Sequence, residues 1–123
     1  MKISIKKEFR NNGLFTVNED IWNIFLSFDN GVFSENGNNY ILTTKDEKIY
    51  TFQKNRELSI VKNQNRYIDA DLSLHNLYES ESNDFGALIL YIPKNEELNN
   101  QPIISTVGGI MGGSSIWLEL KDI

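Results

Sequence analysis

Only one stretch of this 123-residue chain has the apolar spacing of an amphipathic helix, which narrows the folds open to it. In this stretch, apolar residues recur at i, i+3, i+4 and i+7, at Ile21, Ile24, Phe25 and Phe28. Thr16 and Glu19 have capping-box spacing at its start, and Asn18 is a competing N-cap. The Asp-Asn-Gly run 29–31 suits its end, because Asn and Gly accept the left-handed conformation. The pattern predicts a single helix that ends near residue 28.

The rest of the chain has the two-residue period and the Ile, Thr, Tyr and Phe content of strands. We expect strands at 2–9, 40–45, 48–54, 58–62, 68–74, 87–92, 103–107 and 116–121. The continuously apolar segment 87–92 suits a strand that is covered on both faces. The predicted fold class is α+β in a single domain, 1–123, with the helix packed on a mostly antiparallel sheet of six to eight short strands. A curled sheet or half-barrel also fits.

The negative charge of the chain is concentrated in one segment. Between Arg66 and Lys94 there is no basic residue. This segment contains five carboxylates, Asp69, Asp71, Glu79, Glu81 and Asp84, and the other 12 acidic residues balance the 12 Lys and Arg. The whole formal charge of −5 therefore arises here. A surface of one sign attracts a partner of the opposite sign, so we expect a basic protein partner.

Composition excludes several classes of function. The absence of cysteine removes disulfides, thiol catalysis and Cys-ligated metals. The acidity argues against nucleic acid as a ligand, and we interpret Lys2, Lys6, Lys7 and Arg10 as a solvated strand face. We find no signal-peptide run, and the longest apolar stretch, 87–92, is too short for a membrane helix. We therefore expect a cytoplasmic protein that binds no cofactor, nucleic acid or membrane.

Two groups of residues suggest chemistry without forming a motif. Asp69 and Asp71 share one strand face and can bind a divalent cation, but further ligands are lacking, so we interpret them as solvent-facing. His75, the sole histidine, shares their parity and is interpreted as a surface residue. The glycine-rich segment 108–115 lacks the lysine of a P-loop and leads into a strand, so we interpret it as a connecting loop. No catalytic site is predicted.

Three apolar features have both a core and an interface interpretation. Trp22 and Trp117 are either large core residues or interface anchors, and we favour the core. Ile110 and Met111, in the middle of the glycine-rich segment, either fold back on the core or contact a partner.

In size, acidity, lack of cysteine and richness in Asn, Ile and Lys, the chain resembles the small immunity proteins of bacterial contact-dependent inhibition and polymorphic toxin systems. The segment EDIWNIFLSFDNG, 19–31, is similar to the helix-then-NG element of the SUKH immunity superfamily. The resemblance implies a protein that binds one cognate toxin and blocks its active site or the access of its substrate. Together with the charge, it predicts a partner-binding surface of Asp69, Asp71, His75, Tyr78, Glu79, Glu81 and Asp84.

Three other functions stay open. A phage-encoded inhibitor would use the carboxylates to mimic DNA. A small enzyme would use His75 with Asp69 or Asp71. A structural subunit would self-associate through Ile110, Met111 and Trp117.

Overall fold

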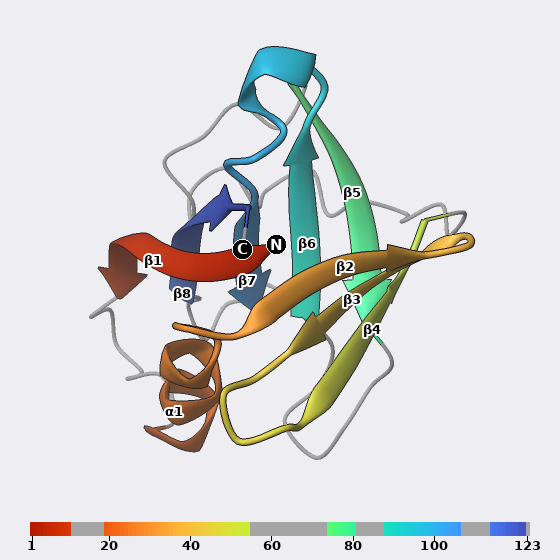
Figure 1. Ribbon diagram of the computed structural model, residues 1–123. Helices are drawn as coiled ribbons and strands as arrows, with labels where there is room; N and C mark the ends of the chain where they lie inside the picture. Colours follow the sequence, from red (N-terminus) through yellow and green to blue (C-terminus); the bar gives the residue numbers. More distant parts are fainter. Residues whose placement is uncertain (11–18, 55–73, 81–87, 107–113, 123) are drawn as a thin grey trace.

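The chain forms a closed, eight-stranded antiparallel β-barrel in the computed structural model, which describes residues 1–10, 19–54, 74–80, 88–106 and 114–122 (Figure 1). Each strand pairs with the next along the chain, and the last pairs with the first. The strands are β1 (Lys2–Arg10), β2 (Val32–Asn36), β3 (Asn39–Thr43), β4 (Ile49–Gln53), β5 (His75–Ser80), β6 (Leu88–Pro93), β7 (Ile103–Thr106) and β8 (Ser114–Lys121). The one α-helix among these residues is α1 (Glu19–Ser27), and a 3-10 turn, η3 (Glu96–Leu98), joins β6 to β7.

The α+β prediction is therefore wrong, and the fold class is all-β. A nine-residue helix is too short to form a layer over a sheet. In the predicted fold the helix covers the apolar face of the sheet. In the structure the sheet closes on itself, and its own strands enclose the apolar core. The predicted strands at 58–62 and 68–74 lie outside the described residues, apart from Leu74. Two strands, β2 and β5, were not predicted at all.

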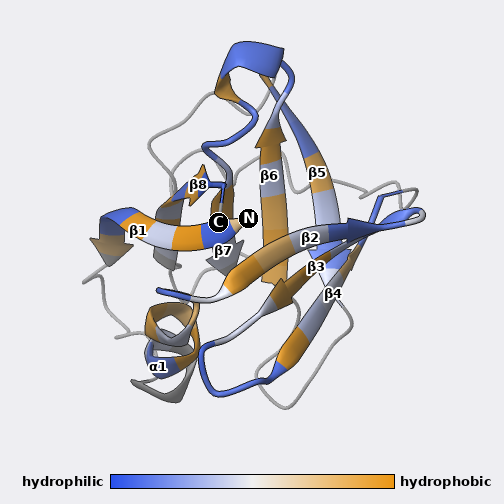
Figure 2. Cartoon of the chain, viewed as in Figure 1, coloured by the Kyte–Doolittle hydropathy of each residue, from blue (hydrophilic) through white to orange (hydrophobic). Residues whose placement is uncertain are grey.

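Alternate residues of each strand point into the barrel and form its core. The interior contains Ile3, Phe33, Leu42, Phe52, Leu88, Leu90, Ile92, Ile104, Ile116, Leu118 and Leu120, all buried. The hydropathy colouring shows this alternation along the strands as changes between orange and paler or blue bands (Figure 2). An eight-stranded barrel is just wide enough for side chains to fill it, and aromatic and aliphatic side chains supply that volume here.

The helix α1 lies against one end of the barrel, beside the turn between β3 and β4 (Figure 1). Trp22 and Phe25 are buried in the barrel core, and Phe28, just after the helix, packs edge-on against Tyr50 at a ring distance of 5.2 Å. Trp22 is thus a core residue, as we favoured. The backbone N–H of Lys45 in the turn donates to the carbonyl of Ser27 at 3.2 Å. The helix therefore contributes its apolar side to the barrel core.

The barrel closes between β1 and β2 through the segment that follows the helix. Ile3 donates to the carbonyl of Gly31 and accepts from the N–H of Asn30, both at 2.9 Å. The N–H of Ile5 donates at 3.0 Å to the Asp29 carboxylate, a side chain that takes the place of a ladder carbonyl. Asn30 has a φ of 64°, which allows the chain to leave the helix and enter β2.

The strand β6 is buried on both faces, as its apolar sequence predicts. Leu88, Leu90 and Ile92 face the barrel interior. Ile89 and Tyr91 face outwards and form a second cluster with Ile103, against which Leu77 and Trp117 pack. Four residues of this outer cluster are paired side by side across the strands β5 to β8, in the order Leu77, Tyr91, Ile103 and Trp117.

Candidate partner-binding surface

Three of the seven predicted partner-binding residues lie in the described part of the chain, all on β5. They are His75, Tyr78 and Glu79. Asp69, Asp71, Glu81 and Asp84 lie outside the described residues, as do the predicted metal pair, Ile110, Met111 and most of the glycine-rich segment. The structure therefore shows how one strand of the acidic segment is held, between β4 and β6.

His75 and Glu79 share the outer face of β5 with Leu77 and are half-buried. His75 lies opposite Pro93 in the register, and its ring meets the buried ring of Tyr91 edge-on at 6.4 Å. Glu79 lies opposite Ile89 on β6 and Gln53 on β4. The β5 backbone thus brings His75 and Glu79 to the outer wall of the barrel, two residues on either side of Leu77.

Tyr78 has the opposite orientation and packs against the barrel core. Its ring centroid lies 5.0 Å from that of Tyr40, and the two side chains are hydrogen-bonded to each other. The sequence-based surface grouped Tyr78 with His75 and Glu79, but the strand's alternation separates it from both.

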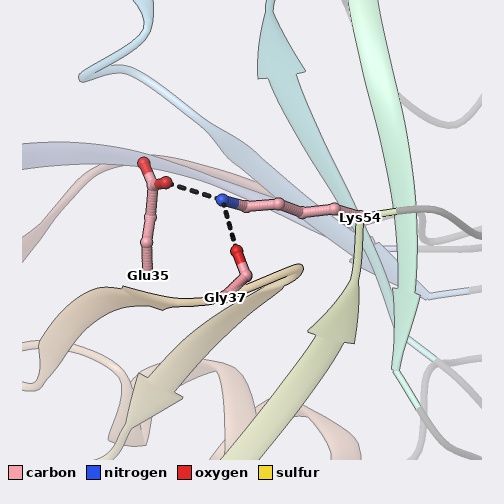
Figure 3. A network of polar contacts seen from close by, with 3 residues as sticks. All are labelled: Glu35, Gly37 and Lys54. Carbon is pink, nitrogen blue, oxygen red and sulfur yellow. Dashed lines mark hydrogen bonds and ion pairs between the residues drawn. The ribbon is translucent and has the colours of Figure 1, made fainter.

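Tyr40 also belongs to a polar cluster at the end of the β2–β3 hairpin, which no motif in the sequence indicates. The ammonium group of Lys54 lies 2.6 Å from a carboxylate oxygen of Glu35 and 3.4 Å from the carbonyl oxygen of Gly37 (Figure 3). It also lies 4.5 Å from the centroid of the Tyr40 ring. Burial, followed by the nearby Tyr78 and Glu35, raises the pKa of Tyr40 to about 12. A carboxylate, a carbonyl and an aromatic face are all groups that stabilise an ammonium ion. The cluster holds the hairpin against the end of β4 and neutralises Glu35.

A basic and aromatic pair lies on the outer wall at β1 and β8. The ammonium group of Lys7 lies 4.6 Å from the centroid of the Trp117 ring, and the two residues are opposite each other in the register. The register shifts between Ile5 and Lys7, so that Lys6 is the extra residue of a β-bulge. Trp117 is half-buried on the outer wall, so it is neither a residue of the barrel core nor a fully exposed interface anchor.

The outer cluster around Tyr91 predicts a loss of stability at alkaline pH. Tyr91 is fully buried, accepts a hydrogen bond from the Ser105 hydroxyl at 2.9 Å, and has a pKa that burial raises from 10.0 to about 12. Above pH 10 the unfolded chain releases this proton while the folded chain keeps it. The stabilisation is therefore complete below pH 10 and is lost as the pH rises towards 12.

We expect the Tyr91 contribution to the free energy of unfolding to fall by roughly 1.4 kcal/mol between pH 8 and pH 11, because the loss is about 1.4 kcal/mol per pH unit above the unfolded pKa of 10.0. Urea unfolding at both pH values measures this, and Tyr91→Phe should show a smaller decrease than the wild type. An equal decrease in both proteins would contradict this role for Tyr91. Tyr40, and Tyr50, whose pKa is raised by burial and by Asp46, account for part of the decrease that Tyr91→Phe retains.

The described residues contain no group of three or more His, Asp or Glu side chains that could hold a metal ion. None of their helices is both long and apolar enough to cross a membrane.

The comparisons with known proteins yield no relative. No protein-family model matches the chain, and it has no match among curated proteins or solved structures.

Proposed function

We propose that this chain is an inhibitory binding protein, and specifically a cytoplasmic immunity protein that covers the active site of a cognate, basic toxin such as a nuclease. The observation that carries the proposal is the segment between Arg66 and Lys94, which holds five carboxylates and no cation while the rest of the chain is balanced. We propose binding without catalysis as the function of this segment.

The position of β5 supports a fixed acidic surface. β5 pairs with β4 and with β6, and β6 is buried on both faces, so the strand has little freedom to move. The backbone of Glu79 is thus held in the wall of the barrel, with its side chain on the outer face. A preorganised charged group contributes more to association than a mobile one, because less conformational entropy is lost on binding.

The neighbours of Glu79 on the adjoining strands favour the same interpretation. An outer row of the register runs from Glu79 through Gln53 and Asn39 to Asn36. These amide side chains supply hydrogen-bond acceptors and carry no charge. Lys54 directly follows Gln53 in the sequence. Its ammonium group donates to the Glu35 carboxylate and to the Gly37 carbonyl oxygen, so its charge is already compensated. A basic partner therefore meets acceptors and a carboxylate along this row.

The test is binding to the product of the neighbouring toxin gene, measured by calorimetry at two salt concentrations. We expect tight binding that weakens at high salt. Reversing Asp69, Asp71, Glu81 and Asp84 to lysine together should weaken binding by at least about a hundredfold, mainly through slower association. Glu79→Lys is measured as a separate variant.

A matched control is the double reversal of Glu96 and Glu97 to lysine. These two residues are exposed on η3 and lie outside the acidic segment, so the change in net charge matches that of two reversals within it. We expect this control to change affinity far less than any pair from the segment. Equal losses would mean that net charge alone matters, and unchanged affinity in all variants would refute an acidic interface.

A further inference from the structure

The sequence contains three Asn-Gly pairs, at 12–13, 30–31 and 36–37. In such a pair the backbone nitrogen of glycine can attack the side-chain amide of asparagine, because glycine has no Cβ atom to obstruct the approach. The first pair lies outside the described residues. The other two lie in very different surroundings, so the structure distinguishes a protected pair from a reactive one.

The pair Asn30–Gly31 is held in the segment that closes the barrel. The N–H of Gly31 donates to the carbonyl of Phe28, and the N–H of Asn30 donates to the carbonyl of Ile3, both at 2.9 Å. Gly31 is also buried. The nitrogen that would attack is therefore already bonded, and freeing it requires the barrel closure to open. Opening of a core segment costs a large part of the global stability.

The pair Asn36–Gly37 lies at the tip of the β2–β3 hairpin, which projects from the side of the barrel (Figure 1). Both residues are exposed. Asn36 is the last residue of β2, and Gly37 has a φ of 60° in the turn that follows. A Cβ atom on Gly37 would meet nothing within 4 Å, so the space around the turn is open. Opening of such a hairpin tip costs little free energy.

The turn is held through its carbonyl groups, not through the nitrogen of Gly37. The Lys54 ammonium group contacts the Gly37 carbonyl oxygen, and the Lys54 N–H donates to the carbonyl of Asn38 at 2.8 Å (Figure 3). Within the part of the chain that the structure describes, the N–H of Gly37 and the side-chain amide of Asn36 have no hydrogen-bond partner. Both reacting groups are therefore free.

We propose that Asn36 is a site of spontaneous deamidation in the folded protein. The Gly37 nitrogen loses its proton to hydroxide and attacks the side-chain carbonyl carbon of Asn36. A carbon–nitrogen bond to Gly37 forms, and the bond from this carbon to the amide nitrogen breaks. The amide nitrogen takes a proton from water and leaves as ammonia, which regenerates hydroxide and produces a succinimide ring. Water then opens the ring at either carbonyl and produces aspartate or isoaspartate.

The reaction would change both the charge and the pairing of the hairpin. Either product places a new carboxylate in the outer row that contains Asn39 and Gln53, and it makes the net charge of −5 more negative by one. Isoaspartate also adds a methylene group to the main chain before Gly37. This extra group would disturb the pairing of residue 36 with Asn39. The inference does not depend on the proposed toxin binding.

Peptide mass spectrometry after incubation at pH 8 tests the proposal, with the folded protein compared with the guanidinium-unfolded chain. Incubation in heavy-oxygen water marks the residues that react before digestion. In the unfolded chain, Asn30 and Asn36 should react at similar rates, because both precede glycine. Folding should slow Asn30 by at least about a hundredfold and Asn36 by less than about tenfold, because only Asn30 needs the barrel to open. Asn30 is thus an internal control.

Two variants test the chemistry at the hairpin. Gly37→Ala should slow the reaction at Asn36 by at least about tenfold, because its Cβ atom obstructs the attack. Asn36→Gln should abolish it, since glutamine would have to close a larger ring. Folding that protects Asn36 as strongly as Asn30 overturns the proposal. Aspartate without isoaspartate at position 36 also overturns it, because direct hydrolysis of the amide would then be the reaction.

Discussion

Gly31→Ala is expected to lower the free energy of unfolding by at least roughly 3 kcal/mol, because a methyl group at this position would collide with the backbone. A Cβ atom on Gly31 would lie 2.3 Å from the carbonyl oxygen of Thr43 and 2.9 Å from that of Phe28. Neither oxygen is on a flexible side chain. Gly31 also accepts the hydrogen bond from Ile3 that joins β1 to β2, so relieving the collision would disturb the barrel closure.

Gly37→Ala is the matched control in this experiment. Gly37 has a φ of 60°, which disfavours alanine, but a Cβ atom there would meet nothing within 4 Å. We expect a cost of only about 1 kcal/mol, from the backbone conformation alone. Urea unfolding of both variants separates steric collision from backbone strain. Equal costs for the two substitutions would show that Thr43 and Phe28 do not hold Gly31 in this way.

The local elements of the fold were largely predictable because their side-chain spacing is regular. Helix α1 follows from the apolar period and the Asp-Asn-Gly run after it. β6 follows from the continuously apolar run 87–92, of which the described residues Leu88 to Ile92 are buried. In such segments the pattern of burial is set by residues close in sequence, and the period therefore identifies the element.

β2 and β5 were missed because their inward residues are partly polar. In β5 the inward positions include Tyr78 and Ser80, and the Ser80 hydroxyl oxygen accepts a hydrogen bond from the N–H of Leu88 at 2.8 Å. In β2 the fourth residue, Glu35, is inward by alternation, but its carboxylate lies at the end of the barrel and binds Lys54. Neither segment shows the two-residue hydrophobic period on which the prediction relied.

The closure of the barrel could not be predicted from local patterns. It depends on β1 pairing with β8 at the far end of the chain, and on β1 meeting the segment after α1. A curled sheet and a closed barrel have the same alternation along each strand, and they differ only in the pairing of the first strand with the last. The α+β prediction failed at this step.

The parts of the candidate surface depend on sequence and register to different extents. The acidic segment can be identified by counting charges, and this count placed Glu79 in the predicted partner-binding surface. The inward position of Tyr78 requires the strand assignment, because only the alternation along β5 separates it from His75 and Glu79. The sequence alone therefore indicated the acidic segment but not the orientation of each of its side chains.

Phe28→Ala is expected to lower the free energy of unfolding by about 3–5 kcal/mol, the usual range for removing a buried phenylalanine. Phe28 is fully buried, and its ring packs edge-on against Tyr50 of β4 at 5.2 Å. Its backbone also bonds to Phe25 and to Gly31, so the residue lies where the helix, the barrel core and the closing segment meet. Removing the Phe28 ring would therefore weaken the packing of the helix, the barrel core and the closing segment together.

Leu26→Ala provides the control from the same helix. Leu26 is 36% exposed, and alanine is at least as good a helix former, so the cost should stay within about 1 kcal/mol. Urea unfolding followed by far-ultraviolet circular dichroism measures both variants. A single transition for Phe28→Ala, shifted to lower urea, would mean that α1 and the barrel unfold together as one unit. Equal costs for the two variants would instead mean that the barrel is stable without the packing of Phe28 against it.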